Sequence, residues 1–284
     1  MHFWDHSVPG LRWAWLEPGF DHPRLKGTPS LDAPRYTTPE FLAESAGAGV
    51  VAAVHVQAAA WSDDPVRETV WLDGLASSTG WPHALIGSVR LVEEDAVGVV
   101  AGHQVSDRFR GVRDLSVPVA ALDDPALVDR FAELAPLAGT VELMVTHEHF
   151  QKLGVLAGRA PAAVLVIGHA GLPLERGEAY RATWQKAMTA LAATRNVVCK
   201  ISALASGTDP QWTVDSLRPW VLGCIEAFGT DRCMLATNWP IDRLHGTYDR
   251  LVDAYREIIA ELTPDERGAL LHATAEQVYR LGSS

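Results

Sequence analysis

Imidazole, guanidinium, ammonium and amide side chains follow a series of short, mostly apolar runs in this sequence. In chain order they are His2, His55, Gln57, Arg90, Arg113, His147, His149, His169, Lys200 and Asn238. An imidazole exchanges a proton or binds a metal near neutral pH, and a guanidinium holds a carboxylate through parallel hydrogen bonds. If the fold brings the ends of these runs together, the side chains could act on a small anionic molecule.

The apolar runs have the composition of buried β-strands. They are rich in β-branched residues and cover 50–57, 84–89, 109–113, 140–145, 163–167, 197–201 and 233–237. Helix signals lie between them, for example Thr38-Pro39-Glu40 and Asp124-Pro125. Strands that alternate with helices in this way are parallel and joined by helical crossovers.

With a stub at residues 1–4, the sequence has eight strand candidates. It therefore predicts an α/β fold of the (β/α)₈ TIM-barrel type, one domain over residues 1–284, with a truncated or missing first strand. A doubly wound open sheet is the alternative, although no glycine-rich nucleotide-binding motif follows any strand. In a barrel the chemistry lies at the C-terminal ends of the strands, where the polar side chains are found here.

Residues 7–36 contain many prolines, glycines and charges and are expected to form a long, structured loop after the first strand. A missing first strand would leave two neighbouring strands with unpaired edges, which is costly. We therefore expect the gap to be covered by this loop or by a partner subunit. A homodimer is a possible consequence.

Composition limits the classes of partner. The net charge is −11 without a basic stripe, so nucleic acid is not an expected partner. The sequence has no signal-peptide pattern and no apolar run of membrane-spanning length, which predicts a cytoplasmic protein without membrane contact. Cys199, Cys224 and Cys233 match no zinc motif and are expected to be reduced and buried.

An ordered set of short motifs resembles the amidohydrolase-related TIM-barrel hydrolases, a group that includes sugar-acid and dicarboxylate lactonases. The motifs are His2-Phe-Trp-Asp5, Val56-Gln-Ala58, Glu68-Thr-Val-Trp-Leu72, Arg110-Gly-Val-Arg113, Gly168-His-Ala-Gly-Leu-Pro173, Asn196-Val-Val-Cys-Lys-Ile-Ser202, Phe228-Gly-Thr-Asp-Arg232, Asn238-Trp-Pro240 and Tyr279-Arg-Leu281. They cover nearly the whole chain.

The resemblance implies a set of site residues, with departures. In the family the first strand ends in His-x-His, the sixth in Asp-His and the eighth in Ser-Asp-Trp-Pro, around a metal or around the substrate itself. His2, His169 and Asn238 occupy three of these positions and are the expected catalytic residues. The other histidine is absent, Gly168 replaces one aspartate, and Asn238 replaces the aspartate that takes the proton from water.

These departures affect the expected metal site. A carboxamide accepts no proton at neutral pH, and zinc prefers three imidazole, thiolate or carboxylate ligands. No resident cofactor is therefore expected. Zinc held by His2 and His169 is the remaining possibility.

Six further residues are expected to bind substrate, namely Trp4, His55, Gln57, Arg113, Lys200 and Trp239. Several have structural alternatives. Arg113 could clamp a carboxylate or form an internal salt bridge, for example with Glu142. His55 could be a substitute base or a buried histidine bonded to a neighbour, and Lys200 could serve a structural ion pair.

Three functions remain open. The first is a hydrolase that opens a lactone or related ester or amide of a small acidic metabolite. The second is a metal-independent lyase, decarboxylase, isomerase or cyclase on the same scaffold, because the aspartate base is lost. The third is a catalytically inactive binding protein.

Overall fold

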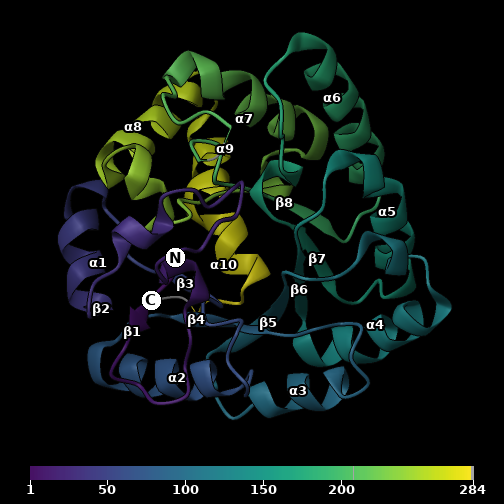
Figure 1. The fold of residues 1–284 in the computed structure, drawn as a ribbon. Coiled ribbons are helices and arrows are strands. Elements are labelled where there is room, and N and C mark those ends of the chain that lie inside the picture. Colours follow the sequence, from purple (N-terminus) through teal and green to yellow (C-terminus); the bar gives the residue numbers. More distant parts are fainter. Residues whose placement is uncertain (207, 283–284) are drawn as a thin grey trace.

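A seven-stranded parallel sheet curls into a barrel that helices surround (Figure 1). The computed structural model describes residues 1–206 and 208–282. The strands are β3 (Val54–Val56), β4 (Ala84–Ser88), β5 (Phe109–Asp114), β6 (Thr140–Leu143), β7 (Val164–Ile167), β8 (Val197–Ile201) and β9 (Cys233–Leu235). Each strand is hydrogen-bonded to the next one in the chain, in the order β3 to β9. A doubly wound sheet would reverse its strand order, so the TIM-barrel prediction is confirmed.

Helical crossovers connect successive strands, as the alternation of segments predicted. They are α1 (Thr38–Ser45), α2 (Arg67–Thr79), α3 (Ala96–His103), α4 (Pro125–Ala138), α5 (Phe150–Arg159), α6 (Glu178–Ala192), α7 (Val214–Phe228) and α8 (Tyr248–Ile258), followed by α9 (Pro264–Gly268) and α10 (Thr274–Val278). Asp124 caps α4 as expected and accepts the Ala126 N–H. The cap of α1 is Thr37, one residue before the expected Thr38, in a capping box with Glu40. No described helix is both long and apolar enough to cross a membrane.

The first barrel strand is reduced to two residues. The Met1 amine donates to the Val54 carbonyl at 3.0 Å, and the Val56 N–H donates to the Met1 carbonyl at 3.0 Å. This is one rung of a parallel ladder. On the other side, the His2 N–H donates to the Trp239 carbonyl at 2.8 Å, so residues 1–2 bridge β3 and the segment that follows β9. Residues 1–2 therefore occupy the place of the first barrel strand.

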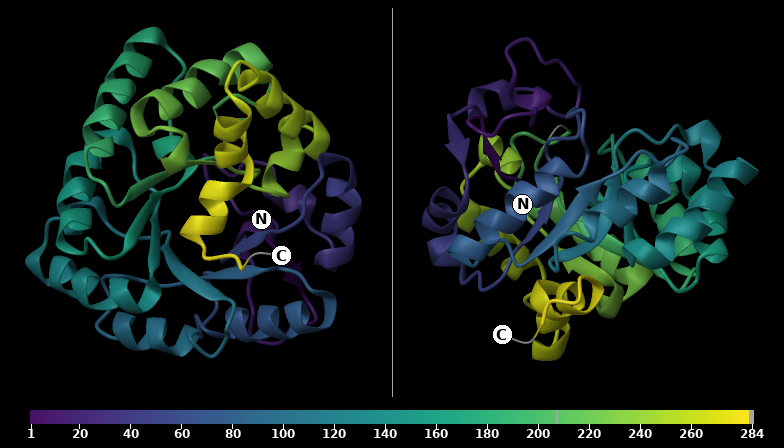
Figure 2. Two further views of the ribbon diagram at one scale, coloured as in Figure 1. Left: turned by 180° about the vertical axis from the view of Figure 1, so that it is seen from behind. Right: turned by 90° about the horizontal axis from the view of Figure 1, so that it is seen from below.

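The gap beneath these residues holds a cavity of about 570 Å³. Its walls include 50–53 before β3 and the first residue of β3, 234–237 at the end of β9, and side chains of α8 and α10. No described residue of 7–36 lines it, so the expectation that this loop covers the gap is wrong. The loop instead lies at the opposite end of the barrel from the C-terminal helices (Figure 2). Coverage by a partner subunit stays a prediction.

The loop is anchored by an aromatic cluster of its own. Phe3, Trp4 and Trp15 are at most 3% exposed and pack with Tyr36 and Trp239. Next to this cluster, β1 (Trp4–Asp5) pairs antiparallel with β2 (Arg35–Tyr36). Burial of several large aromatic rings fixes the backbone at the start of the chain, and therefore the position of the imidazole at residue 2.

The main core lies between the strands and the outer helices. Leu165, Ile167 and Val197 of β7 and β8 are fully buried and belong to the same cluster as Trp184 of α6 and Trp220 of α7. The three cysteines are free and buried in this layer, as expected.

A matched pair of glycine substitutions tests the packing of the barrel wall. A Cβ at Gly111 in β5 would lie 2.3 Å from the Thr140 carbonyl oxygen, whereas a Cβ at Gly98 in α3 would meet nothing within 4 Å. We expect Gly111→Ala to lower the free energy of unfolding by about 1–3 kcal/mol. Gly98→Ala should raise it by about 0.5–1 kcal/mol. Urea denaturation measures both, and equal effects at the two positions would contradict the packing described here.

Candidate active site

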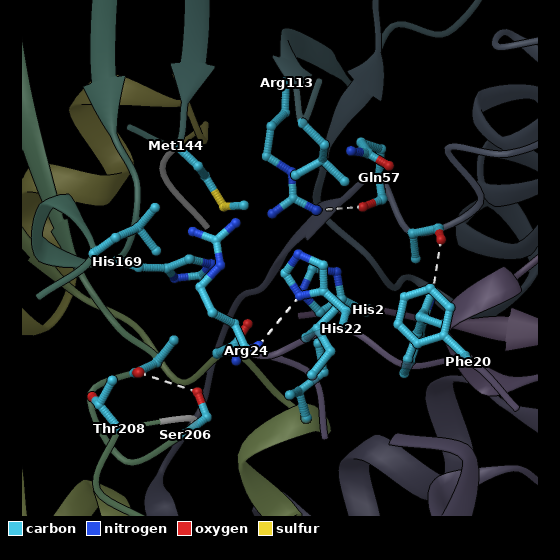
Figure 3. A pocket seen from close by; sticks show the side chains of 18 of the residues that line it. His2, Phe20, His22, Arg24, Gln57, Arg113, Met144, His169, Ser206 and Thr208 are labelled. Atoms are coloured by element: carbon cyan, nitrogen blue, oxygen red, sulfur yellow. Dashed lines mark hydrogen bonds between the residues drawn. The ribbon is translucent and has the colours of Figure 1, made fainter. Parts of the chain in front are cut away.

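A cavity of about 180 Å³ lies at the C-terminal ends of the barrel strands, as predicted (Figure 3). Five of the nine predicted site residues line it, namely His2, Gln57, Arg113, His169 and Asn238. They come from the truncated first strand and from the ends of β3, β5, β7 and β9. The fold therefore brings together side chains that are far apart in the sequence.

The ring of His2 has one defined tautomer. Its Nδ1 lies 2.8 Å from the Val56 carbonyl oxygen. Because a carbonyl only accepts, Nδ1 carries the hydrogen and Nε2 keeps its lone pair. Burial, the nearby chain terminus and Arg113 hold the pKa of His2 well below its usual range. His2 is therefore a neutral imidazole with a bare nitrogen on the wall of the cavity.

His169 follows β7 and lies on the opposite wall. Its Nδ1 and the Ser202 hydroxyl are 2.8 Å apart, so β8 orients a ring that β7 carries. Burial, Lys200 and Arg113 hold the pKa of His169 well below its usual range. The imidazole is therefore neutral at physiological pH. If Ser202 donates to Nδ1, the other ring nitrogen carries a hydrogen that can be donated to a ligand.

Strained backbone accumulates at this rim. Left-handed φ values occur at His169 (56°), Ala170 (53°) and Leu172 (52°) after β7, at Ala203 (54°) after β8 and at Asn238 (50°) after β9. Such conformations cost free energy in residues other than glycine and cluster at functional sites. The strain turns the chain sharply as each strand ends, and four of these five residues, all except Ala170, line the cavity.

Asn238 is held by a carboxyl group that sequence reasoning missed. The Asn238 amide nitrogen donates to Asp242 Oδ1 at 2.9 Å, and Asp242 is 2% exposed. Burial raises the pKa of Asp242 to about 7. A carboxylate only accepts, so the amide nitrogen faces Asp242 and the amide oxygen is left for a ligand. An aspartate at 238 would put two carboxyl groups together and force one to stay protonated.

Below the cavity, the barrel interior contains a buried charge network. Glu142 accepts from Lys200 and from the Tyr279 hydroxyl, the latter at 2.6 Å. Lys200 and Arg113 lower the pKa of Glu142 against the effect of its burial. Lys200 lines the cavity of about 570 Å³ in the gap, called the lower cavity, and not the cavity of about 180 Å³ at the strand ends, called the upper cavity. This position agrees with the alternative in which Lys200 forms a structural ion pair.

Arg113 has a different position from Lys200. Its guanidinium donates to the Gln57 carbonyl at 2.6 Å, while Nε has no partner among the described residues. It lines both cavities. The side chain is thus placed to donate to an anion in the upper cavity.

Three other predicted substrate-binding residues lie outside the upper cavity. His55 is fully buried and its Nε2 accepts the Phe3 N–H at 2.9 Å, so it supports the backbone next to His2. Trp4 donates to the Ala33 carbonyl and Trp239 to Glu44. All three are hydrogen-bonded to protein groups outside the cavity. A substrate contact for them stays a prediction. The candidates Arg90, His147 and His149 do not line the cavity either.

The outer wall comes from residues outside the predicted site, of which the sequence indicated only the loop tryptophans as possible pocket walls. Residues 7–36 contribute Trp15, Phe20, His22, Arg24 and Leu25, and Trp61 follows β3. The loop is thus part of the pocket wall, in agreement with the expectation that it is structured. Only its tryptophans were a signal, because no periodicity places the other side chains.

The donor set does not fit a zinc ion. In the described part of the chain, no group of three His, Cys, Asp or Glu side chains is arranged to hold a metal. The cavity offers the bare His2 nitrogen, His169 and the Asn238 amide oxygen, which is one strong ligand fewer than zinc prefers. We therefore derive no reaction step through a metal.

Comparisons with known proteins agree on one family. The sequence profile described as amidohydrolase matches residues 1–281. Protein y4mH of Sinorhizobium fredii is 31% identical over 293 residues, covering 99% of this chain and 97% of that protein. The L-fucono-1,5-lactonase of Burkholderia ambifaria is 29% identical over 252 residues, covering 83% and 82%. 

A solved structure is also similar. The amidohydrolase of Burkholderia multivorans, crystallised with bound zinc, has a TM-score of 0.83 at 25% identity and covers 99% of this chain and 97% of its own. The matched profile spans the strands, the strained rim and the cavity residues alike. The chain therefore belongs to the amidohydrolase family.

Proposed function

We propose that this protein is a lactonase-like hydrolase that opens a lactone or related ester of a small acidic molecule, with side chains instead of a metal activating the water. The observation that carries the proposal is the His2 ring, a neutral imidazole whose bare Nε2 lies in the same cavity as Arg113 and His169. The relationship to L-fucono-1,5-lactonases supports the reaction class.

The proposed reaction begins with a water held between His2 Nε2 and the Asn238 amide oxygen. The water attacks the lactone carbonyl while His2 takes its proton. His169, with Ser202 donating to its Nδ1, donates from its other nitrogen to the oxyanion of the tetrahedral intermediate. When the ring C–O bond breaks, protonated His2 returns the proton to the leaving alkoxide. The product is the hydroxy acid.

The experiment is a pH-stat assay of the purified protein on a panel of five- and six-membered lactones and aryl esters, with acid release as the readout. We expect hydrolysis of at least one lactone well above the uncatalysed rate. Acid release from no member of the panel would contradict the proposal. Release of CO₂ from a hydroxybenzoate by the same preparation would favour the non-hydrolytic alternative.

The buried Asp242 predicts a pH dependence. Its carboxylate form is the better acceptor for the Asn238 amide, and its pKa lies at about 7. As pH falls through 7, protonation weakens this bond, so kcat/KM should fall. Asp242→Asn should remove this limb of the profile and lower kcat about tenfold at pH 8, because the charged acceptor of the Asn238 amide is lost. A limb near pH 7 that persists in Asp242→Asn would contradict the assignment.

The same group makes a prediction for stability with the opposite sign. A raised carboxyl pKa means that the folded state prefers the protonated form. The contribution of protonated Asp242 to the free energy of unfolding is fully present below the ordinary aspartate pKa and is lost as the pH rises to about 7. Relative to the wild type, Asp242→Asn should therefore be more stable at pH 8 than at pH 5. Urea denaturation at the two pH values measures the difference.

A further inference from the structure

The upper cavity is lined by two cations and by no carboxylate among the described residues, although Glu142 and Glu68 act on Arg113 from outside the wall. Arg113 enters from β5 and Arg24 from the 7–36 loop, and no aspartate or glutamate is among the described lining residues. Burial lowers the pKa of Arg24, and no acidic neighbour acts on that pKa. Figure 3 shows the Arg24 guanidinium beside His169 and directed toward Met144 and Arg113. Two cations thus face the same space from opposite sides.

The two side-chain hydroxyls on the wall of this cavity already have partners. The Ser206 hydroxyl already donates to the Ala203 carbonyl at 3.1 Å. The Thr208 hydroxyl donates to the Pro173 carbonyl at 3.3 Å and accepts from Arg176 at 2.9 Å. A ligand hydroxyl that reaches only this part of the wall would lose hydration without gaining a free partner, which is costly.

Much of the rest of the wall is apolar, beside the polar side chains of the catalytic candidates, His22 and Gln57. Aromatic rings face the cavity from the N-terminal side, and Leu172, Pro173 and Leu174 face it from the segment after β7. The aromatic residues are Trp15, Phe20 and Trp61. A wall of this kind gains free energy by covering alkyl or aryl surface.

One unpaired polar group lies among these residues. Gln57 is 1% exposed, and both its amide nitrogen and its amide oxygen lack a partner among the described residues. A buried amide without partners is unfavourable, so a ligand that supplies a hydrogen bond here would be selected. The Gln57 carbonyl accepts from the Arg113 guanidinium, so the unpaired amide and this cation belong to neighbouring parts of the wall.

We propose that the substrate is a lactone or ester that carries one carboxylate on an apolar, alkyl or aryl, skeleton, and that Arg24 and Arg113 together hold this carboxylate. The substrate class then differs from that of a sugar lactone, which is uncharged and polyhydroxylated. The 7–36 loop becomes a determinant of specificity, since it supplies both a cation and aromatic wall. This inference rests on the proposed hydrolase function for the reaction, but its anion site can be tested without turnover.

The test is isothermal titration calorimetry with three ligands: phenylacetate, its neutral isostere phenylacetamide, and L-fuconate as a hydroxylated carboxylate. Phenylacetate should bind at least about tenfold more tightly than either of the others, the size expected for a hydrogen bond to a charged group. Arg24→Ala should remove about tenfold of the preference for phenylacetate over its amide. Arg12→Ala is the matched control, since Arg12 lies on the same loop, pairs with Glu17 and does not line the cavity.

Equal binding of the acid and the amide, tighter binding of L-fuconate, or binding of none of the three would overturn the proposed substrate class. Lactone hydrolysis in the pH-stat assay would still support the proposed function in each of these cases. Conversely, anion preference that depends on Arg24, in a protein that hydrolyses no lactone, would support the anion site and contradict the hydrolase. The two proposals therefore fail in different experiments.

Discussion

Replacing His2 by asparagine is expected to lower kcat for lactone hydrolysis by about 10²–10⁴-fold, the usual contribution of a general base. The asparagine amide nitrogen can take the place of Nδ1 and keep the hydrogen bond to the Val56 carbonyl. No lone pair of suitable basicity then remains in the cavity. Initial rates in the pH-stat assay, at saturating and at low substrate, measure the change in kcat and in kcat/KM.

The matched control for this substitution is His149→Asn. His149 also follows a barrel strand but does not line the cavity, so its replacement should leave both constants within about twofold. Urea midpoints equal to that of the wild type would show that His2→Asn keeps the fold. Retention of more than a tenth of the wild-type kcat by a folded His2→Asn variant would contradict the assignment of His2 as the base.

Replacing Glu142 by glutamine is expected to lower the free energy of unfolding by about 3–5 kcal/mol, because it leaves buried cations without their carboxylate. Glu142 pairs with Lys200 and accepts the Tyr279 hydroxyl, and its charge also acts on Arg113. The substitution preserves the shape of the side chain, so it isolates the loss of charge. Urea denaturation followed by tryptophan fluorescence measures the effect.

A second substitution separates charge from packing at this site. In Glu142→Gln combined with Lys200→Met, one buried cation disappears with its partner, so most of the lost stability should return. A Glu142→Gln variant within 1 kcal/mol of the wild type would mean that the network contributes little. No recovery in the double variant would mean that Lys200 is not the cation that Glu142 compensates.

The barrel could be predicted from sequence because its pattern is local and repeated. The runs at 84–89, 140–145 and 197–201 each contain a strand of the sheet, namely β4, β6 and β8. The run at 50–57 was predicted too long, since only Val54–Val56 forms β3. Residues 50–53 line the gap left by the missing strand and lack one neighbour to pair with.

About half of the candidate site could be predicted from the sequence. There are physical reasons why the other half could not. His2, Arg113 and His169 lie at or beyond the end of a strand, so strand direction alone places them at the rim. Alternation along the strand placed His55 with Gln57, but β3 ends at Val56 and the rule does not extend past the strand.

Two further residues could not have been found from local patterns. Arg24 lies in a loop whose path depends on the packing of its aromatic residues. Asp242 reaches Asn238 only because the chain turns sharply after β9, where Asn238 has a left-handed φ. Both positions are consequences of tertiary structure.

The most direct test of the account is the rate of lactone hydrolysis by protein that has been dialysed against a strong chelator and analysed for metals by mass spectrometry. The account predicts an undiminished rate at well below one metal ion per chain, because His2 supplies the base and the cavity lacks a third strong ligand. Loss of activity on chelation, with recovery on addition of one equivalent of zinc, would contradict it.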